Sequence, residues 1–215
     1  MRKLPRSEAI TIDGPAGNIE GLFEAPQDRE LTGCAVVCHP LPTHGGTMHN
    51  KVTHTLARSF VTSNMAALRF NFRGVGKSAG EFDHGNGEVD DIVAAVEWLR
   101  GKVPHLPLWL AGFSFGAALA VRAALKVAPA GLISIAPAVS RFANSLDAQP
   151  HCPWLIVQGD QDELVDLDET IEWFNSLDPG PELQVFPDTG HFFHGKLVAL
   201  RSAAEAFIAA RSEST

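Results

Sequence analysis

The residue best suited to chemistry in this chain is Ser114, which lies at the centre of the pentapeptide GFSFG, residues 112–116. The apolar run before it, residues 108–111, is typical of a short buried strand, and the alanine-rich run 115–128 is typical of a helix. A strand that turns directly into a helix strains the corner residue, and flanking glycines leave room for the turn. The pattern predicts an exposed serine nucleophile at the end of a sheet; the alternative is an ordinary helix N-cap.

A serine hydroxyl becomes an effective nucleophile only when a base takes its proton and a third group orients that base. Two polar segments downstream of Ser114 could supply both groups. The segment GDQDELV, residues 159–165, follows an expected strand at 154–158. The segment PDTGHFFH, residues 187–194, follows the expected last strand at 183–186. A serine, an acid and a histidine therefore occur in that order, each directly after a strand.

Strand-like and helix-like segments alternate along most of the chain. Expected strands cover residues 34–38, 65–72, 108–111, 131–136, 154–158 and 183–186, after an opening antiparallel pair at 6–13 and 18–25. Expected helices cover residues 50–62, 90–100, 115–128, 167–177 and 197–211. This alternation predicts an α/β fold with a mostly parallel sheet covered by helices on both faces. Active sites in such sheets lie at the carboxyl ends of the strands, where these polar segments should meet.

Length and composition fit one soluble domain that covers residues 1–215. The chain is 45% hydrophobic and carries a net charge of −8 with no basic block, so nucleic acid is not an expected partner. No apolar stretch approaches about 18 residues, and the first residues lack the apolar segment of a secretory signal, so no membrane partner is expected. Cys34, Cys38 and Cys152 have no CxxC spacing; as reduced thiols they favour a cytoplasmic location.

The serine–acid–histidine order and the GFSFG turn resemble the α/β-hydrolase superfamily, and the likeness covers almost the whole chain. In that superfamily the acid is usually the second aspartate of a Gly-Asp-x-Asp segment, which implies Asp162. The histidine usually follows a glycine after the last strand, which implies His191. Asp160 or Asp166 could compete with Asp162, and His194 could compete with His191, so these alternatives stay open.

An oxyanion hole needs two backbone N–H groups that point at the developing negative charge. One is expected from Phe115, directly after the nucleophile. The other is expected from the loop HPLPTHGGTMHNKV, residues 39–52. Pro40 and Pro42 have no N–H to donate, which leaves Leu41 between them as the candidate donor.

That loop and the segment NFRGVGKS, residues 71–78, resemble small capless bacterial hydrolases of the dienelactone hydrolase-like group. Their fold has no lid domain, and here only about ten residues, 141–150, lie where a lid would be inserted. Dienelactone hydrolases proper use a cysteine nucleophile, whereas this chain has Ser114. The resemblance therefore implies the fold and the triad rather than the dienelactone substrate.

We expect an apolar acyl pocket near the nucleophile. Its expected lining residues are Phe113, Phe192, His49 and Arg73. Arg73 could meet an acidic substrate, but arginines in Arg-Gly-x-Gly-x-Ser segments usually have a structural role. The structural alternative ties Arg73 to neighbouring carbonyls or to Asp90 and Asp91.

The loop after the first parallel strand carries His39, His44 and His49. Three histidines can bind zinc. Serine chemistry needs no metal, however, so we expect neither a metal nor a cofactor.

Together these features predict a cytoplasmic serine hydrolase that cleaves short-chain carboxylic esters through an acyl-enzyme. The expected partner is a small ester, and a homodimer is left open. Alternatives with the same triad are a thioesterase, a lactonase or a small amidase. A non-catalytic binding protein on this fold is a further alternative, although such a protein need not retain all three residues.

Overall fold

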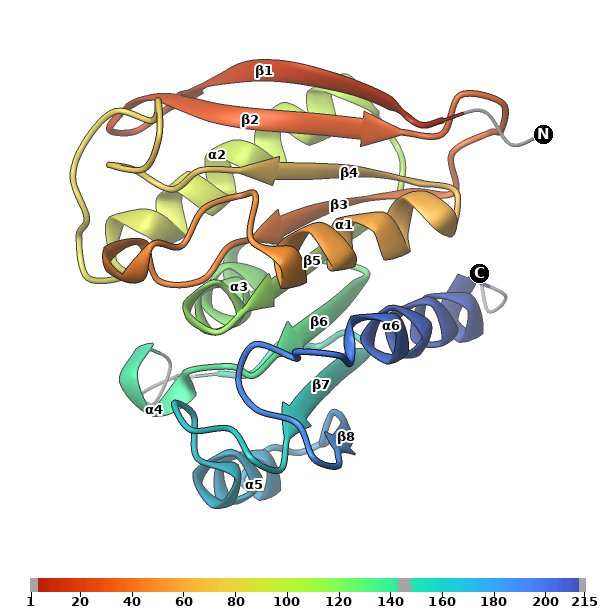
Figure 1. Ribbon diagram of the computed structural model, residues 1–215. Coiled ribbons are helices and arrows are strands. Elements are labelled where there is room, and N and C mark those ends of the chain that lie inside the picture. The colour runs from red at the N-terminus through yellow and green to blue at the C-terminus, as the bar shows by residue number, and fades with distance from the viewer. Residues whose placement is uncertain (1–3, 143–147, 213–215) are drawn as a thin grey trace.

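The structure, a computed structural model, describes residues 4–142 and 148–212. At its centre lies an eight-stranded sheet in the order β1-β2-β4-β3-β5-β6-β7-β8 (Figure 1). Its strands are β1 (Arg6–Gly14), β2 (Gly17–Ala25), β3 (Gly33–Cys38), β4 (Met65–Phe70), β5 (Leu108–Phe113), β6 (Gly131–Ile135), β7 (Trp154–Gly159) and β8 (Glu182–Phe186). Strand β2 pairs antiparallel with both β1 and β4, and the strands from β4 to β8 pair in parallel.

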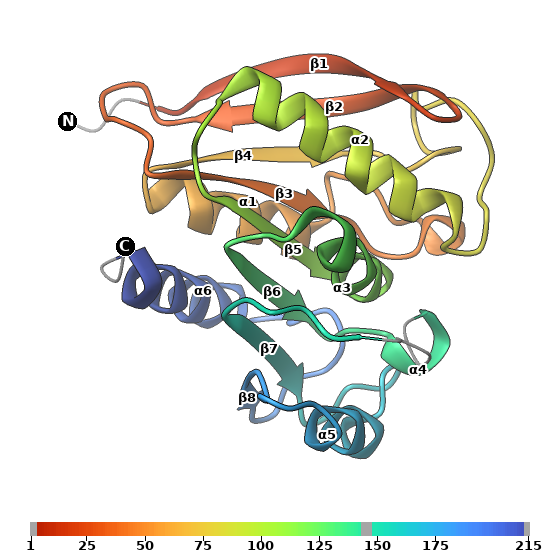
Figure 2. The same ribbon diagram turned by 180° about the vertical axis from the view of Figure 1, so that it is seen from behind.

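Helices cover both faces of the sheet. Helices α1 (Lys51–Thr62) and α6 (Leu197–Ser212) lie on the face seen in Figure 1. Helices α2 (Gly87–Lys102), α3 (Phe115–Val127) and α5 (Leu167–Asn175) lie on the face seen in Figure 2. Two short helices, η1 (Pro42–His44) and α4 (Val139–Phe142), lie in connecting loops. The predicted α/β fold with a mostly parallel, doubly covered sheet is therefore confirmed.

The core is divided into two layers by the sheet, because successive side chains of a strand point to opposite faces. Val36 and Leu110 pack in the layer under α2 and α3, whereas Val37 and Trp109 pack in the layer under α1 and α6. All residues of β3, β4, β5, β6 and β7 are buried. The central strands are near-continuous apolar runs, interrupted by buried polar residues such as Arg69, Ser134 and Gln158.

One helix begins earlier than its apolar periodicity predicts. Helix α2 begins at Gly87, not at residue 90. The buried carboxylate of Glu88 accepts hydrogen bonds from the N–H groups of Asp83 and Gly85, at 2.7 and 2.8 Å. The Asp83 carboxylate in turn accepts the N–H of Gly87 at 2.9 Å. These polar contacts stabilise the first turn, so an apolar pattern cannot reveal it.

The expected lid position lies between β6 and β7. Helix α4 ends at Phe142, residues 143–147 lie outside the described residues, and the chain continues from residue 148 into β7. No helix in the described ranges is long and apolar enough to span a membrane. The three cysteines are free thiols: Cys34 and Cys38 are buried in β3, and Cys152 is half-buried.

Candidate active site

Ser114 is the single residue between β5 and α3, and its backbone is strained. Its φ and ψ angles are 55° and −116°, a conformation that residues with a side chain rarely adopt. The Ser114 N–H donates to the Ile135 carbonyl at 2.8 Å, and its own carbonyl accepts the N–H groups of Ala117 and Ala118, both at 3.1 Å. Neighbouring strand and helix bonds thus hold the strained corner. The Ser114 side chain makes no capping hydrogen bond, unlike an ordinary N-cap serine.

The two glycines of the GFSFG turn are required by close packing. A Cβ atom on Gly112 would collide with the carbonyl of Gly116. A Cβ atom on Gly116 would collide with the carbonyl oxygens of His39 and Cys38. The first glycine therefore lets the helix fold back over the strand, and the second lets α3 approach the loop after β3.

His191 stands between the nucleophile and an acid. Its Nε2 atom lies 3.0 Å from Ser114 Oγ, and its Nδ1 atom lies 3.0 and 2.9 Å from the two carboxylate oxygens of Asp162. Both side chains are shielded from solvent, with 3% of His191 and none of Asp162 exposed. An ionised carboxylate only accepts hydrogen bonds, so Nδ1 carries the proton of the neutral ring. The lone pair of Nε2 then faces the serine hydroxyl, as a general base requires.

The Asp162 carboxylate is held by a full set of donors. Oδ1 accepts the N–H groups of Leu164 and Val165 at 2.9 and 2.8 Å, and Oδ2 accepts Nε2 of Gln158 at 2.9 Å. Burial raises the pKa of Asp162, but the hydrogen bonds from His191, Val165 and Leu164 outweigh it and hold this pKa below its usual value. Asp162 is therefore ionised at neutral pH and fixed in orientation.

The competing acids and histidine have other partners. Asp160 accepts the N–H of Thr189 at 3.2 Å, and Asp166 caps α5 by accepting the N–H of Glu169 at 3.0 Å. His194 is exposed, and its described ring contact is with Phe192. The structure thus brings Asp162 and His191 to Ser114, and does not bring these alternatives there.

Two aromatic rings flank the imidazole. The ring of Phe113 lies 4.9 Å from that of His191, tilted by 35°, and Phe192 meets the imidazole edge-on at 5.2 Å. Phe113 is fully buried, so it supports the imidazole from inside and cannot line a pocket open to substrate. Phe192 is 42% exposed and presents an apolar surface beside the site.

The loop after β3 is fixed by His39. This buried side chain accepts the N–H of Phe72 through Nε2 at 3.1 Å, so Nδ1 carries the proton and donates to the Pro40 carbonyl at 2.6 Å. Burial lowers the pKa of His39 to about 4, although the hydrogen bond to Pro40 opposes the shift. The imidazole is therefore neutral and serves as a structural link between the ends of β3 and β4.

This link positions the first of the two expected oxyanion donors. The Leu41 carbonyl accepts the N–H groups of His44 and Gly46 at 3.2 and 3.1 Å, which closes a tight turn. Within the described part of the chain, the N–H groups of Leu41 and Phe115 donate to no protein acceptor. Two free donors therefore lie on segments that pack together through Gly116. Such donors can receive the negative oxygen of an acyl-transfer intermediate.

Two expected pocket residues are engaged elsewhere. Arg73 forms a two-armed ion pair with buried Asp91, with Nη2–Oδ1 and Nε–Oδ2 distances of 2.8 and 3.0 Å, and donates to the Gly87 carbonyl at 2.6 Å. The structural alternative for Arg73 therefore holds. His49 is exposed and lines a hollow over β1 and β2 with Glu20 and Lys77.

The histidines of this loop do not form a metal site. His39 uses both ring nitrogens in protein hydrogen bonds, and Nδ1 of His44 lies 3.1 Å from the Thr43 hydroxyl. Across residues 4–142 and 148–212, no three His, Cys, Asp or Glu side chains are grouped to hold a metal ion.

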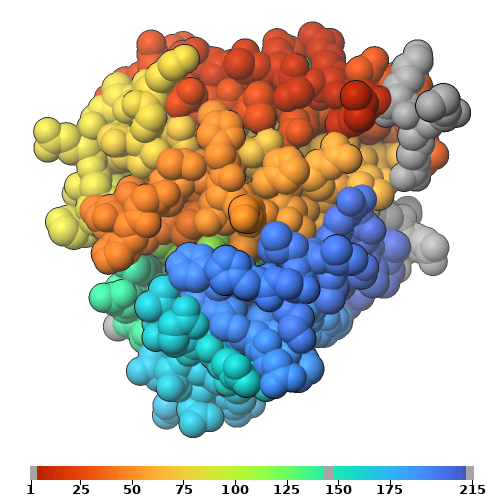
Figure 3. Space-filling model, viewed as in Figure 1, coloured from red at the N-terminus to blue at the C-terminus, as the bar shows by residue number. Residues whose placement is uncertain are grey.

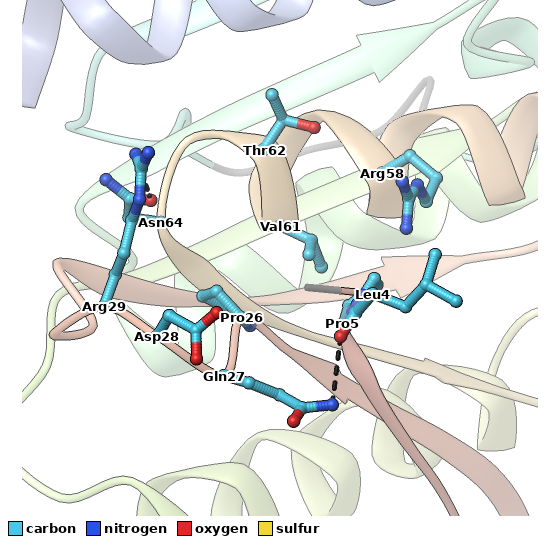
Figure 4. A pocket seen from close by; sticks show the side chains of 10 residues that line it. All are labelled: Leu4, Pro5, Pro26, Gln27, Asp28, Arg29, Arg58, Val61, Thr62 and Asn64. Carbon is cyan, nitrogen blue, oxygen red and sulfur yellow. Dashed lines mark hydrogen bonds between the residues drawn. The ribbon is translucent and has the colours of Figure 1, made fainter. Parts of the chain in front are cut away.

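Four hollows on the surface are lined by residues other than Ser114, Asp162 and His191. One of about 200 Å³, drawn in Figure 4, lies beyond the end of β2 and α1 and is lined by residues such as Pro26, Val61 and Asn64. In Figure 3 a narrow strip of green, from the middle of the chain, shows between the orange loop after β3 and the blue segment before α6.

Two residues that touch the triad were not expected from the motifs. Gln158 bonds to Asp162, and the Glu163 carboxylate accepts the backbone N–H of His191 at 3.1 Å. The available signal was weak: Gln158 is a polar residue within an apolar strand, and Glu163 is one of several acids in its loop.

Comparison with known proteins agrees with this fold. The family model described as "Serine aminopeptidase, S33" matches residues 41–148. The chain is 48% identical to an α/β serine hydrolase without lid from Xanthomonas campestris, with a TM-score of 0.90 and 94% of each chain covered. It is 42% identical to an α/β serine hydrolase homologue from Coxiella burnetii, with a TM-score of 0.89 over 93% of this chain and 96% of the other. An uncharacterized protein of Rickettsia prowazekii is 34% identical over 197 residues, which cover 87% of this chain and 82% of the relative.

Proposed function

The chain belongs to the α/β-hydrolase superfamily of serine hydrolases, and from this premise we propose that it cleaves short-chain carboxylic esters through an acyl-enzyme. The observation that carries the proposal is the continuous line of hydrogen bonds from Asp162 through His191 to Ser114. This arrangement is the one that converts a serine hydroxyl into a nucleophile at neutral pH.

In the first half of the reaction, Ser114 Oγ attacks the ester carbonyl carbon while His191 Nε2 takes the hydroxyl proton. The carbonyl oxygen becomes negative and is stabilised by the N–H groups of Leu41 and Phe115. When the tetrahedral intermediate collapses, the C–O bond to the alcohol breaks, and His191 gives its proton to the leaving oxygen. Asp162 stabilises the imidazolium that exists between these two transfers.

In the second half, water replaces the alcohol. His191 takes a proton from water as the water oxygen attacks the acyl carbon, and it returns the proton to Ser114 Oγ as the acid leaves. Every proton that moves is carried by His191, and no group is oxidised or reduced. The proposed reaction therefore needs no cofactor.

A short, uncharged acyl group suits this surface. The exposed ring of Phe192, which lies 5.2 Å from the imidazole of His191, offers an apolar contact for a short acyl chain. The guanidinium of Arg73 is already paired with Asp91, so it is not available to a substrate carboxylate. A small amide is the second candidate, because the matching family model is described as a serine aminopeptidase.

The test combines labelling with a substrate series. A fluorophosphonate probe should label wild-type protein at Ser114, which peptide mapping would locate. Hydrolysis of p-nitrophenyl esters from acetate to palmitate should show the highest kcat/KM between acetate and hexanoate. Aminoacyl p-nitroanilides of matched size test the amide alternative. Absence of labelling would contradict a serine hydrolase, and faster anilide than ester cleavage would favour the amidase.

A further inference from the structure

Gln158 is a polar residue buried within an apolar strand. It lies near the end of β7 and has no exposed surface. Its Nε2 atom lies 2.9 Å from Oδ2 of Asp162 and 3.1 Å from the carbonyl oxygen of Val165. Its amide oxygen, Oε1, has no hydrogen-bond partner among the described residues. Both amide hydrogens are therefore used, while the oxygen is buried and unpaired.

This orientation of the amide follows from its neighbours. If the amide were turned over, Oε1 would face two oxygen acceptors, which repel it. In the observed orientation the unpaired oxygen destabilises the folded protein. An apolar side chain would avoid this destabilisation, and Ile156, two residues earlier on the same face of β7, packs in the apolar core. The feature of Gln158 that an apolar residue cannot replace is its pair of N–H donors.

Both oxygens of the Asp162 carboxylate lie within hydrogen-bond distance of His191 Nδ1, Oδ1 at 3.0 Å and Oδ2 at 2.9 Å. The N–H groups of Leu164 and Val165 hold Oδ1, and both belong to the same loop as Asp162. Oδ2 accepts Nε2 of Gln158 at 2.9 Å and lies 2.9 Å from Nδ1 of His191. Gln158 therefore ties the carboxylate to the rigid sheet at one of the two oxygens that contact the imidazole.

We propose that Gln158 is a positioning residue for the Asp162–His191 pair. Its N–H group sets the orientation of the Asp162 carboxylate and moderates the negative charge on Oδ2. This inference rests on the proposed serine hydrolase function. A donor to Oδ2 withdraws negative charge from that oxygen and so moderates its pull on the imidazolium. Other charged groups at this site are Glu163, which accepts the His191 N–H, and Asp160, which accepts the Thr189 N–H. The variants below leave both unchanged.

The main variant is Gln158→Met, which keeps the size of the side chain and removes the donors. We expect kcat to fall about 10- to 100-fold with little change in KM, the order expected for a lost hydrogen bond to an ionised carboxylate. The acid limb of the kcat/KM profile should move to higher pH, because an oxygen without its donor stabilises the imidazolium more strongly. The downfield proton resonance of His191 Nδ1–H should also shift.

The matched control is Ser134→Ala. Ser134 is fully buried in β6, and its hydroxyl accepts a hydrogen bond from Trp154 Nε1 at 3.0 Å, with no bond to the triad. This variant also loses a buried hydrogen bond, but it should keep wild-type kcat and an unmoved acid limb. If kcat falls equally in the two variants and the acid limb of the kcat/KM profile moves in neither, Gln158 acts through stability alone. That result would overturn the inference.

A second variant covers the case in which Gln158→Met does not fold. In Gln158→Glu the new carboxyl group can donate to Asp162 only when protonated. Its rate relative to wild type should therefore rise as the pH is lowered, and a ratio independent of pH would overturn the inference. If wild-type Ser114 is not labelled by the fluorophosphonate, the proposed function fails and the inference fails with it. If wild type is labelled and Gln158→Met behaves as wild type, only the inference fails.

Discussion

The Nε2 atom of His191 lies 3.0 Å from the Oγ atom of Ser114, although 77 residues separate them in the sequence. The contact exists because β5 and β8 end at the same edge of the sheet, with Ser114 directly after β5 and His191 in the loop after β8. Ser114 is held there by a strained turn, and His191 by Asp162 on one ring nitrogen and by Glu163 on its backbone N–H. The base is thus oriented before any substrate arrives.

Replacing the nucleophile should abolish activity without unfolding the protein. Ser114→Ala keeps the backbone of the GFSFG turn but removes Oγ, so we expect ester hydrolysis to fall by about 10³-fold or more. Thermal unfolding should change little, because the hydroxyl bonds to His191 alone among the described side chains. Ser176→Ala, an exposed serine beyond α5, serves as the control. A folded Ser114→Ala protein with more than about a tenth of the wild-type rate would exclude this serine as the nucleophile.

The two histidines of the last loop should behave very differently. His191→Ala removes the base and should lower kcat by about 10³-fold or more. His194→Ala changes an exposed ring that packs beside Phe192, and it should cost less than about tenfold. Steady-state kinetics of both variants on one short ester tests this. The reverse order of losses would identify His194 as the base and would reopen the role of Asp162.

Gly116, the second glycine of the GFSFG turn, should tolerate no side chain. In Gly116→Ala the new Cβ would collide with the carbonyl oxygens of His39 and Cys38, so α3 or the loop after β3 must shift. We expect a loss of about 1–3 kcal/mol of unfolding free energy and a clear fall in kcat. Gly101→Ala is the matched control, because a Cβ there meets nothing within 4 Å. That variant should be neutral or more stable by up to about 1 kcal/mol. Chemical denaturation of both variants would decide.

Stability should fall with decreasing pH because of His39. Its pKa is lowered to about 4 in the folded protein, against about 6.5 when unfolded, so between these values the unfolded chain binds more protons. The contribution of neutral His39 is fully present above about pH 6.5 and is lost as the pH falls towards 4, by roughly 3 kcal/mol in total.

The measurement is urea denaturation from pH 7 to pH 4 for wild type and His39→Gln. The glutamine variant has no charge to gain, so its stability should be lower at pH 7 but should fall less steeply between pH 6.5 and 4. The lowered pKa of Asp162 also reduces stability on the acid side, but it acts in both proteins and cancels in the difference. Parallel curves would show that His39 does not titrate in this way.

Local patterns in the sequence predicted most of the fold, because they depend on residues close together in the chain. Alternation of apolar runs with amphipathic segments indicated a parallel sheet, since each element must bury its own apolar face. The GFSFG turn indicated a strained corner at Ser114, because only glycines leave space for such a turn. The flanking prolines singled out Leu41, because proline has no N–H. The loop order and the family resemblance then indicated Asp162 and His191, the residues that the structure brings to Ser114.

The tertiary structure alone decided which polar side chains pair with one another. The sequence predicted Arg73 as a pocket residue, but in the structure Arg73 pairs with Asp91 of α2. It also predicted His49 as a pocket residue, but His49 lines a hollow over β1 and β2. Gln158 and Glu163 gained their roles in the same way, from partners brought close by the fold. Partner choice depends on distances across strand ends and between layers, which residue spacing does not encode. The sequence therefore determined the chemistry available at each strand end, and the packing of the sheet determined which of these groups meet.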